Sequence, residues 1–251
     1  MEHEIDHIDV TNERELSAAV ATHHWYHTIE LPGGVVTPGR YDHRPLLPHY
    51  GLPKDLGGMR TLDVATFDGF WAFEMERRGA NVSAIDVERV SQLDLPDPVQ
   101  RQRSAEGYDA PISNGFRLAQ RALGSTVNLA GLSVYDLSPS NVGTFDLVHL
   151  SDLLLHLRSP IQALTAVRSV TAGSAVISDV FHPGLTVLGG LHSVEYVGGW
   201  SDLVWWIPSL QALGQMVIDA GFRSVSLHAV YNLARRQERT GFWRAVLLAE
   251  T

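Results

Sequence analysis

The chain has 251 residues, of which 45% are hydrophobic, and its net charge is -9 when histidine is neutral. This length suits one domain with a sizeable core, and the absence of cysteine excludes disulfides and thiolate chemistry. The acidic amino terminus lacks the apolar centre of a signal peptide, and no run approaches the roughly 20 apolar residues of a membrane span. We therefore expect a cytoplasmic protein without a membrane segment, and the negative charge argues against a broad phosphate-binding surface.

Helices and strands are predicted to alternate along the chain. An amphipathic helix over 13–24 and a Pro- and Gly-rich segment over 31–58 come first. Strands are then expected at 61–64, 82–85, 126–134, 145–150 and 174–180, with helices at 70–78, 115–123, 161–170 and 209–220. Pro96 and Pro98 are expected to break the chain, and 224–230 and 242–248 to form a closing β pair. This order predicts an α/β fold with a parallel sheet covered on both faces.

The most informative stretch joins the first two strands. It has the strand–turn–helix–strand order of a parallel crossover unit, with Gly69 at the turn and Asp63 and Asp86 at the strand ends. The cleft at the carboxyl ends of such strands binds nucleotide-type ligands, but the G-x-G-x-x-G fingerprint of dinucleotide sites is absent. A sulfonium nucleoside carries no phosphate, and the two carboxylates would supply acceptors for its ribose and cationic tail. A purely structural crossover unit is the alternative.

The turn itself resembles that of a known enzyme class. Asp63-x-Ala65-x-Phe67-x-Gly69 resembles the D-x-G-x-G-x-G turn of class I S-adenosylmethionine (SAM) methyltransferases, with two of the three glycines replaced. Larger side chains at these two positions are expected to crowd the cofactor tail or to wall its site.

Three longer stretches resemble the wobble-uridine tRNA methyltransferase-like family: Trp25–Gly39, Leu154–Pro160 and Trp206–Phe222. The resemblance implies a seven-stranded, Rossmann-like class I methyltransferase fold with SAM as cofactor. It also implies an N-terminal helix and loop cap over the active site, 1–58, followed by a SAM-binding domain, 59–251, with an aromatic insertion at about 181–208.

Departures from that family point away from tRNA. Its tRNA enzyme uses carboxy-SAM, whose extra carboxylate needs donors, and such members have a Tyr where this chain has Leu155 and a Lys near Trp25, where this chain has only histidines. Arg235, Arg236 or Arg239 would be the alternative cations. We expect ordinary SAM and a small-molecule acceptor, as in members that modify natural products.

The resemblance and the strand ends together give the candidate cofactor residues. Asp86 is expected to accept both ribose hydroxyls, and Asp136 to face the adenine amino group, although an N-cap or Asx-turn role is the alternative for Asp136. The full set is Asp63, Ala65, Thr66, Phe67, Gly69, Asp86, Val87, Tyr135, Asp136, Leu150 and Ser151.

Two histidines are candidate bases. A hydroxyl acceptor must lose a proton, and His156 and His182 follow the fourth and fifth strands, where an imidazole can accept it at neutral pH. The alternative for His156 is to buttress the helix that begins near Ser159 and Pro160.

The chain is rich in histidine, with 12 residues, but no group has a defined metal-ligand spacing, so no metal is predicted. The aromatic residues Tyr196, Trp200, Trp205 and Trp206 predict a lid or wall over an apolar acceptor, with plain core packing as the alternative.

Three function classes stay open at this point. The first is a SAM-dependent methyltransferase that acts on an oxygen or nitrogen of a small molecule. The second is a tRNA-modifying transferase, which predicts a basic strip on the surface built from arginines such as Arg101, Arg103, Arg117, Arg121, Arg235, Arg236 and Arg239. The third is a SAM-binding protein with non-methylating catalysis. A homodimer is also left open.

Overall fold

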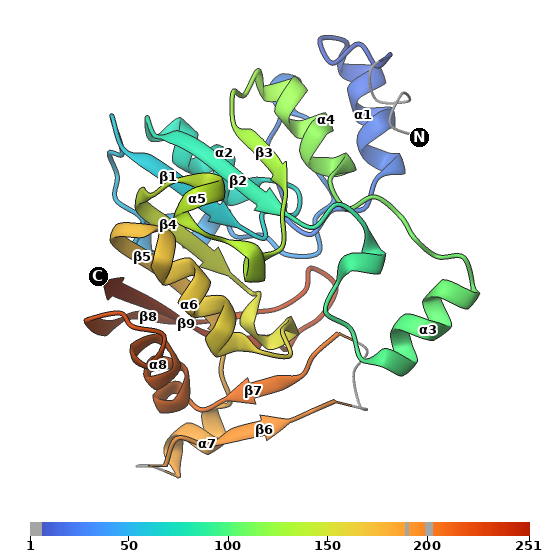
Figure 1. The fold of residues 1–251 in the computed structure, drawn as a ribbon. Coiled ribbons are helices and arrows are strands. Elements are labelled where there is room, and N and C mark those ends of the chain that lie inside the picture. Colours follow the sequence, from blue (N-terminus) through green and yellow to red (C-terminus); the bar gives the residue numbers. More distant parts are fainter. Residues whose placement is uncertain (1–6, 189–190, 199–202) are drawn as a thin grey trace.

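The computed structural model of the chain describes residues 7–188, 191–198 and 203–251 (Figure 1). Its centre is a seven-stranded sheet in the order β3-β2-β1-β4-β5-β9-β8. The strands are β1 (Arg60–Val64), β2 (Asn81–Asp86), β3 (Asn128–Gly131), β4 (Phe145–Ser151), β5 (Thr171–Val180), β8 (Ser224–Leu233) and β9 (Phe242–Glu250).

The first five strands are parallel, and β9 runs antiparallel between β5 and β8. The predicted α/β class, the seven strands of the Rossmann-like methyltransferase fold and the closing β pair are therefore confirmed. The strand order reverses between β1 and β4 at the centre of the sheet. The carboxyl ends of β1, β2, β3 and β4 therefore open onto a common crevice.

Helices cover both faces of the sheet (Figure 1). One face carries α1 (Glu13–Thr22), α2 (Phe70–Arg77) and α4 (Asn114–Leu123), and the other carries α5 (Pro139–Val142), α6 (Pro160–Val170) and α8 (Leu210–Asp219). Short 3-10 helices lie at Pro32–Gly34, Arg44–His49, Val90–Gln92, Val134–Asp136 and Leu154–His156.

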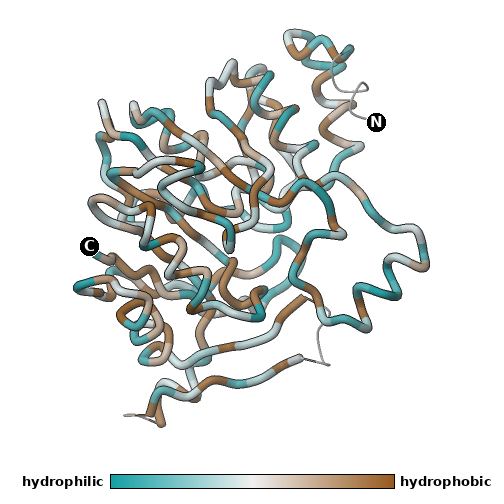
Figure 2. The backbone as a smooth tube through the Cα atoms, in the orientation of Figure 1, coloured by the Kyte–Doolittle hydropathy of each residue, from teal (hydrophilic) through white to brown (hydrophobic). Residues whose placement is uncertain are grey.

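Strand alternation builds two cores from one sheet. Leu62 and Val64 pack with α6 and α8, whereas Val82 and Ala84 pack with α2 and α4. This is the pattern of a sheet buried on both faces. Figure 2 shows the hydrophobic residues gathered along the strands, while the outlying α3 (Asp97–Ala105) is mostly hydrophilic.

Several elements differ from the sequence prediction. Pro96 and Pro98 do not break the chain but begin α3, because proline is well tolerated at the first helical positions. The third strand spans only Asn128–Gly131 rather than 126–134, since the Ser133 side chain caps the 3-10 turn that follows. The segment 181–208 contains α7 (Pro183–Val187) and a two-stranded sheet of β6 (Val194–Tyr196) and β7 (Trp206–Pro208).

Candidate active site

The turn after β1 has an unusual backbone. Ala65 and Phe67 adopt left-handed conformations, with φ of 58° and 52°, at the two positions where the resembling turn has glycine. A left-handed conformation costs an L-residue with a Cβ roughly 1–2 kcal/mol. Gly69 has a φ of 89°, and a Cβ added there would lie 2.7 Å from the ring of Phe116. The turn therefore keeps its shape even though two glycines are replaced.

Asp63 is satisfied within the protein. Its Oδ1 lies 2.7 Å from Nδ1 of His149, and its Oδ2 accepts a 2.6 Å hydrogen bond from the hydroxyl of Thr66. The His149 Nε2 in turn lies 3.1 Å from the hydroxyl of Tyr50. With 1% of its surface exposed, Asp63 fixes the turn rather than offering a free carboxylate.

Asp86, at the end of β2, is different. Each of its oxygens accepts one 2.8 Å backbone hydrogen bond, from Phe67 and from Val87. Burial raises the pKa of Asp86 to about 7, against the lowering effect of these two amides. Each carboxylate oxygen keeps a further lone pair, so Asp86 can accept hydroxyl donors from the cavity.

The N-terminal segment is fastened to the cofactor turn through Asp68. This buried carboxylate accepts 2.8 Å hydrogen bonds from the amides of Tyr26 and His27 and also contacts Nδ1 of His27. One side chain of the turn thus holds two consecutive residues that are about 40 positions earlier in the chain.

A second link joins three parts of the chain. Asp152, directly after β4, accepts a 2.9 Å hydrogen bond from the Tyr26 hydroxyl and a 2.7 Å hydrogen bond from Nε of Arg244 on β9. Its φ is 50°, so strain is stored there as well. Burial and the Asp152 charge raise the pKa of Tyr26 well above its usual value, which keeps the phenol a neutral donor.

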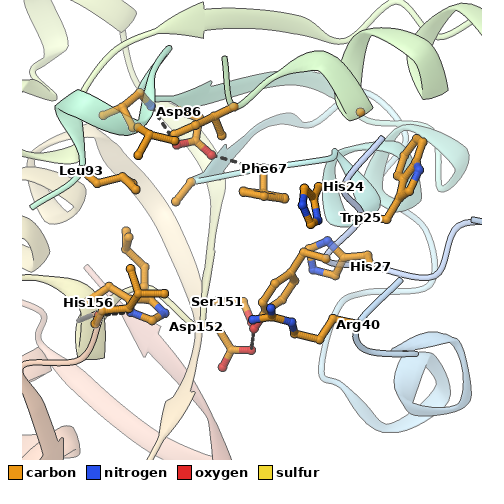
Figure 3. Close-up of a pocket in the computed structure, with 18 of the residues that line it drawn as sticks. His24, Trp25, His27, Arg40, Phe67, Asp86, Leu93, Ser151, Asp152 and His156 are labelled. Atoms are coloured by element: carbon orange, nitrogen blue, oxygen red, sulfur yellow. Dashed lines mark hydrogen bonds between the residues drawn. The ribbon is translucent and has the colours of Figure 1, made fainter. Parts of the chain in front are cut away.

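Tyr26, His27, Asp86, Asp152 and Arg244 line one large cavity of about 1450 Å³. Small-molecule sites are usually about 300–1,000 Å³, so the cavity has room for two ligands side by side. Figure 3 shows Asp86 and Leu93 on one side, His156 and Asp152 below them, and His24, His27 and Arg40 opposite.

The structure brings most of the sequence-predicted residues to this cavity. Its lining includes Asp63, Ala65, Phe67, Asp86, Val87, Tyr135, Ser151 and His156. The remaining predicted residues do not line it: Thr66, Gly69, Asp136, Leu150 and His182.

The residues outside the lining have structural places. Thr66 and Gly69 shape the turn, and Leu150 is fully buried in the sheet core. Asp136 is exposed and ends the 3-10 turn, whereas the preceding Tyr135 lines the cavity and donates a 2.7 Å hydrogen bond to Asp94.

The two candidate bases have opposite surroundings. The Nδ1 of His156 bonds to the carbonyl oxygen of Leu203, and because a carbonyl only accepts, this nitrogen carries the proton and leaves the Nε2 lone pair free. Burial lowers the pKa of His156. In His182, Nδ1 accepts the amide of Leu185, and Nε2 lies 3.5 Å from Glu195, so this ring caps α7.

The aromatic insertion contacts the site from the outside. The Trp205 amide donates to the Leu155 carbonyl at 2.8 Å, and its indole donates to the Asp94 carbonyl at 2.7 Å. Leu203, Val204 and Ile207 line the cavity. Tyr196 and Trp206 pack against each other with ring centroids 5.0 Å apart, and Trp200 lies outside the described residues.

The cavity lining also includes polar residues that the sequence did not single out. Five of them are Tyr26, Arg40, His149, Asp152 and Arg244. Only Asp152 carried a local signal, because it directly follows a predicted strand. The others reach the cavity through contacts between distant parts of the chain.

Neither a metal site nor a membrane span is found in the described part of the chain. No three His, Asp or Glu side chains converge there as metal ligands, and no described helix is long and apolar enough to cross a bilayer.

Comparison with known proteins places this geometry in a family. The family described as "Methyltransferase domain" matches residues 41–227. A ubiquinone biosynthesis O-methyltransferase from Psychrobacter arcticus is 26% identical over 174 residues, which are 66% of this chain and 60% of that protein. The chain thus spans less than two thirds of this relative.

Solved structures agree on the fold. The N-terminal domain of EvdMO1 with SAH bound has a TM-score of 0.65 at 17% identity, covering 96% of this chain and 97% of that one. The 1,6-didemethyltoxoflavin-N1-methyltransferase of Burkholderia thailandensis has a TM-score of 0.55 at 16% identity, covering 83% and 77%. Because the family match covers more than half of the sequence and the sheet has the same architecture, the chain belongs to the methyltransferase domain family and has the class I methyltransferase fold.

Proposed function

We propose that the chain transfers the methyl group of ordinary SAM to a small-molecule acceptor, with His156 as the general base. The observation that carries the proposal is the ring of His156, which lines the cavity with its proton held on Nδ1 and the Nε2 lone pair unused.

The residues present suit the cofactor. Asp86 has spare lone pairs for two ribose hydroxyls, and Tyr135 and Leu93 line the neighbouring wall, where the adenine would lie. The cofactor tail ends in a carboxylate, which needs a cation. Arg40 lines the cavity, and its guanidinium has no hydrogen-bond or ion-pair partner among the described residues (Figure 3). We assign Arg40 to that carboxylate.

The second ligand would occupy the side of the cavity over β4 and β5. SAM supplies an electrophilic methyl group, and in-line positioning of the acceptor is the main task left to the protein. Leu155 offers no donor to an extra carboxylate, which supports SAM over carboxy-SAM. The similarity to an O-methyltransferase supports an acceptor of low molecular weight.

The experiment measures SAH formation and SAH binding in His156→Gln, with His192→Gln as the matched control, because His192 is exposed and does not line the cavity. Loss of a general base lowers turnover by about 100-fold or more, while SAH affinity, measured by calorimetry, should stay unchanged. Full turnover in His156→Gln would refute the assignment. Binding of neither SAM nor SAH by the unaltered protein would refute the proposed function.

Bulk tRNA added to the same assay tests the nucleic-acid alternative. Salt-sensitive tRNA binding together with SAH formation on tRNA would replace the small-molecule acceptor.

A further inference from the structure

The acceptor side of the cavity has a distinct composition. We call it the acceptor chamber and define it by the lining residues from the loop after β4, the end of β5, the insertion and the start of β9: Asp152, Leu153, Leu155, His156, Leu157, Val180, Val197, Leu203, Val204, Ile207, Phe242 and Arg244. Nine of these twelve side chains are apolar, and the other three are the His156 ring and the ion pair of Asp152 with Arg244.

The charged side chains of this chamber are neutralised within the protein, among the described residues. Asp152 and Arg244 form a 2.7 Å ion pair whose side chains are 7% and 2% exposed. The Arg244 Nη1 also donates to the carbonyls of Leu233 and Phe242, and the other oxygen of Asp152 holds the Tyr26 hydroxyl. Of the other arginines that line the cavity, Arg235 pairs with Glu238 at 2.9 Å, and Arg40 is the one assigned above to the carboxylate of the cofactor.

Because the charges of the chamber are already paired, a charged acceptor should bind there less well than a neutral one. A carboxylate or an ammonium group brought into an apolar chamber loses its hydration and finds no free counter-charge there. A neutral ligand loses nothing comparable, and burying its apolar surface stabilises the complex.

The weak basicity of His156 further limits which hydroxyl groups can be methylated. Imidazole has an unperturbed pKa of about 6.5 and a phenol about 10, whereas an aliphatic alcohol is a far weaker acid, similar to bulk water. The proton of a phenol or enol therefore lies much nearer in acidity to His156 than the proton of an alcohol, and burial of His156 widens both gaps.

We propose that the acceptor is a neutral phenol or enol and that it is methylated on oxygen. This inference rests on the proposed function. In the step, the hydroxyl oxygen forms a bond to the methyl carbon, the bond from that carbon to sulfur breaks, and its electron pair returns to sulfur. The hydroxyl proton passes to Nε2 of His156 and then to water.

The test uses matched probes that differ in charge or acidity. Methyl 3,4-dihydroxybenzoate, 2-naphthol and naringenin are the neutral phenols, and 3,4-dihydroxybenzoate, tyramine and benzyl alcohol are the anionic, cationic and weakly acidic counterparts. We expect a kcat/KM at least about tenfold higher for methyl 3,4-dihydroxybenzoate than for its free acid, and no turnover of benzyl alcohol. Calorimetric titration of the SAH complex should give the same order without chemistry.

A substitution inside the acceptor chamber tests whether the lack of a free charge causes the preference for neutral acceptors. Val204→Lys places a cation in the chamber and should reduce the preference for the ester over the acid by about tenfold or more. Val187→Lys, at an 84% exposed position outside the cavity, should leave the preference unchanged.

Faster turnover of the acid, of tyramine or of benzyl alcohol would overturn the inference while leaving the methyltransferase assignment intact. Failure of every neutral phenol to bind the SAH complex at about 1 mM would overturn it too. Failure of the protein to bind SAH at all would instead remove the proposed function beneath it.

Discussion

At the scale of single residues, the cofactor turn keeps a glycine-type backbone with residues that are not glycine. Ala65 and Phe67 hold φ values of 58° and 52°. The sequence marked these two positions as departures from a known turn, and the structure shows that the departure is in the side chains rather than in the path of the chain.

The strain at Ala65 predicts a stabilising substitution. Ala65→Gly removes the clash of the Cβ and should raise the free energy of unfolding by about 1 kcal/mol, net of the greater freedom of glycine in the unfolded chain. Urea unfolding measures the change. In Ala21→Gly, on the exposed side of α1, the same replacement should lower stability by about 0.5–1 kcal/mol. Destabilisation by Ala65→Gly would contradict the argument.

The carboxyl of Asp86 predicts how SAH binding depends on pH. Its pKa is about 7 in the folded protein, and only the ionised form can accept from both ribose hydroxyls. SAH affinity should therefore rise with pH up to about 7 and level off above it, by at most about tenfold per pH unit.

Calorimetry across this range checks the prediction, with Asp86→Asn as the variant that should flatten the curve and weaken binding by about 1–3 kcal/mol. The free energy of unfolding depends on pH in the opposite direction. A carboxyl whose pKa is raised by folding stabilises the folded state at a pH below its pKa in the unfolded chain, and this stabilisation is lost as pH rises through about 7. Affinity that falls with rising pH would show that Asp86 does not hold the ribose.

At the scale of elements, the N-terminal segment and the cofactor turn form one unit through Asp68. Two consecutive backbone amides and one imidazole depend on this single carboxylate. From the sequence, we predicted a cap over the active site at 1–58, and the contacts of Tyr26 and His27 give that proposal a physical basis.

Asp68→Ala should release this segment. Two buried amides lose their acceptor, at about 1–3 kcal/mol each, so limited proteolysis should cut faster between 20 and 45, and SAH affinity should fall. Asp55→Ala, which removes one exposed carboxylate that accepts the Gly57 amide, should change neither result. Unchanged proteolysis in Asp68→Ala would show that other contacts hold the segment.

At the scale of the whole molecule, the cavity lining draws on α1, the ends of the parallel strands, the insertion and β9. A ligand bound there contacts parts of the chain that are far apart in sequence, and it binds only the folded state. Its binding free energy therefore adds to the stability of the entire domain.

SAH at 100 times its dissociation constant should raise the free energy of unfolding by about 2.7 kcal/mol, which corresponds to about 5–10 °C in Tm for a chain of this size. Differential scanning fluorimetry measures the shift, and Asp86→Asn at the same SAH concentration should show a smaller one. A Tm that does not respond to SAH would contradict binding in this cavity.

The sequence by itself determined the sheet, the crossover and the strand-end carboxylates. Hydrophobic periodicity and Gly69 are local properties, and they fix local structure wherever the chain goes. The same reasoning misjudged Pro96 and Pro98, because proline breaks a helix interior but begins a helix equally well.

Only the tertiary structure decided which side chains face the cavity, which of their atoms carry a proton and which charges are paired. His156 and His182 looked equivalent along the chain, and the carbonyl of Leu203 and the carboxylate of Glu195 separated them. Arg40 and Arg244 are both arginines, but Arg244 is neutralised by Asp152, whereas the Arg40 guanidinium has no partner in the part of the chain that the structure describes. A side chain's protonation and availability depend on partners brought together from distant positions, and local patterns carry no record of those partners.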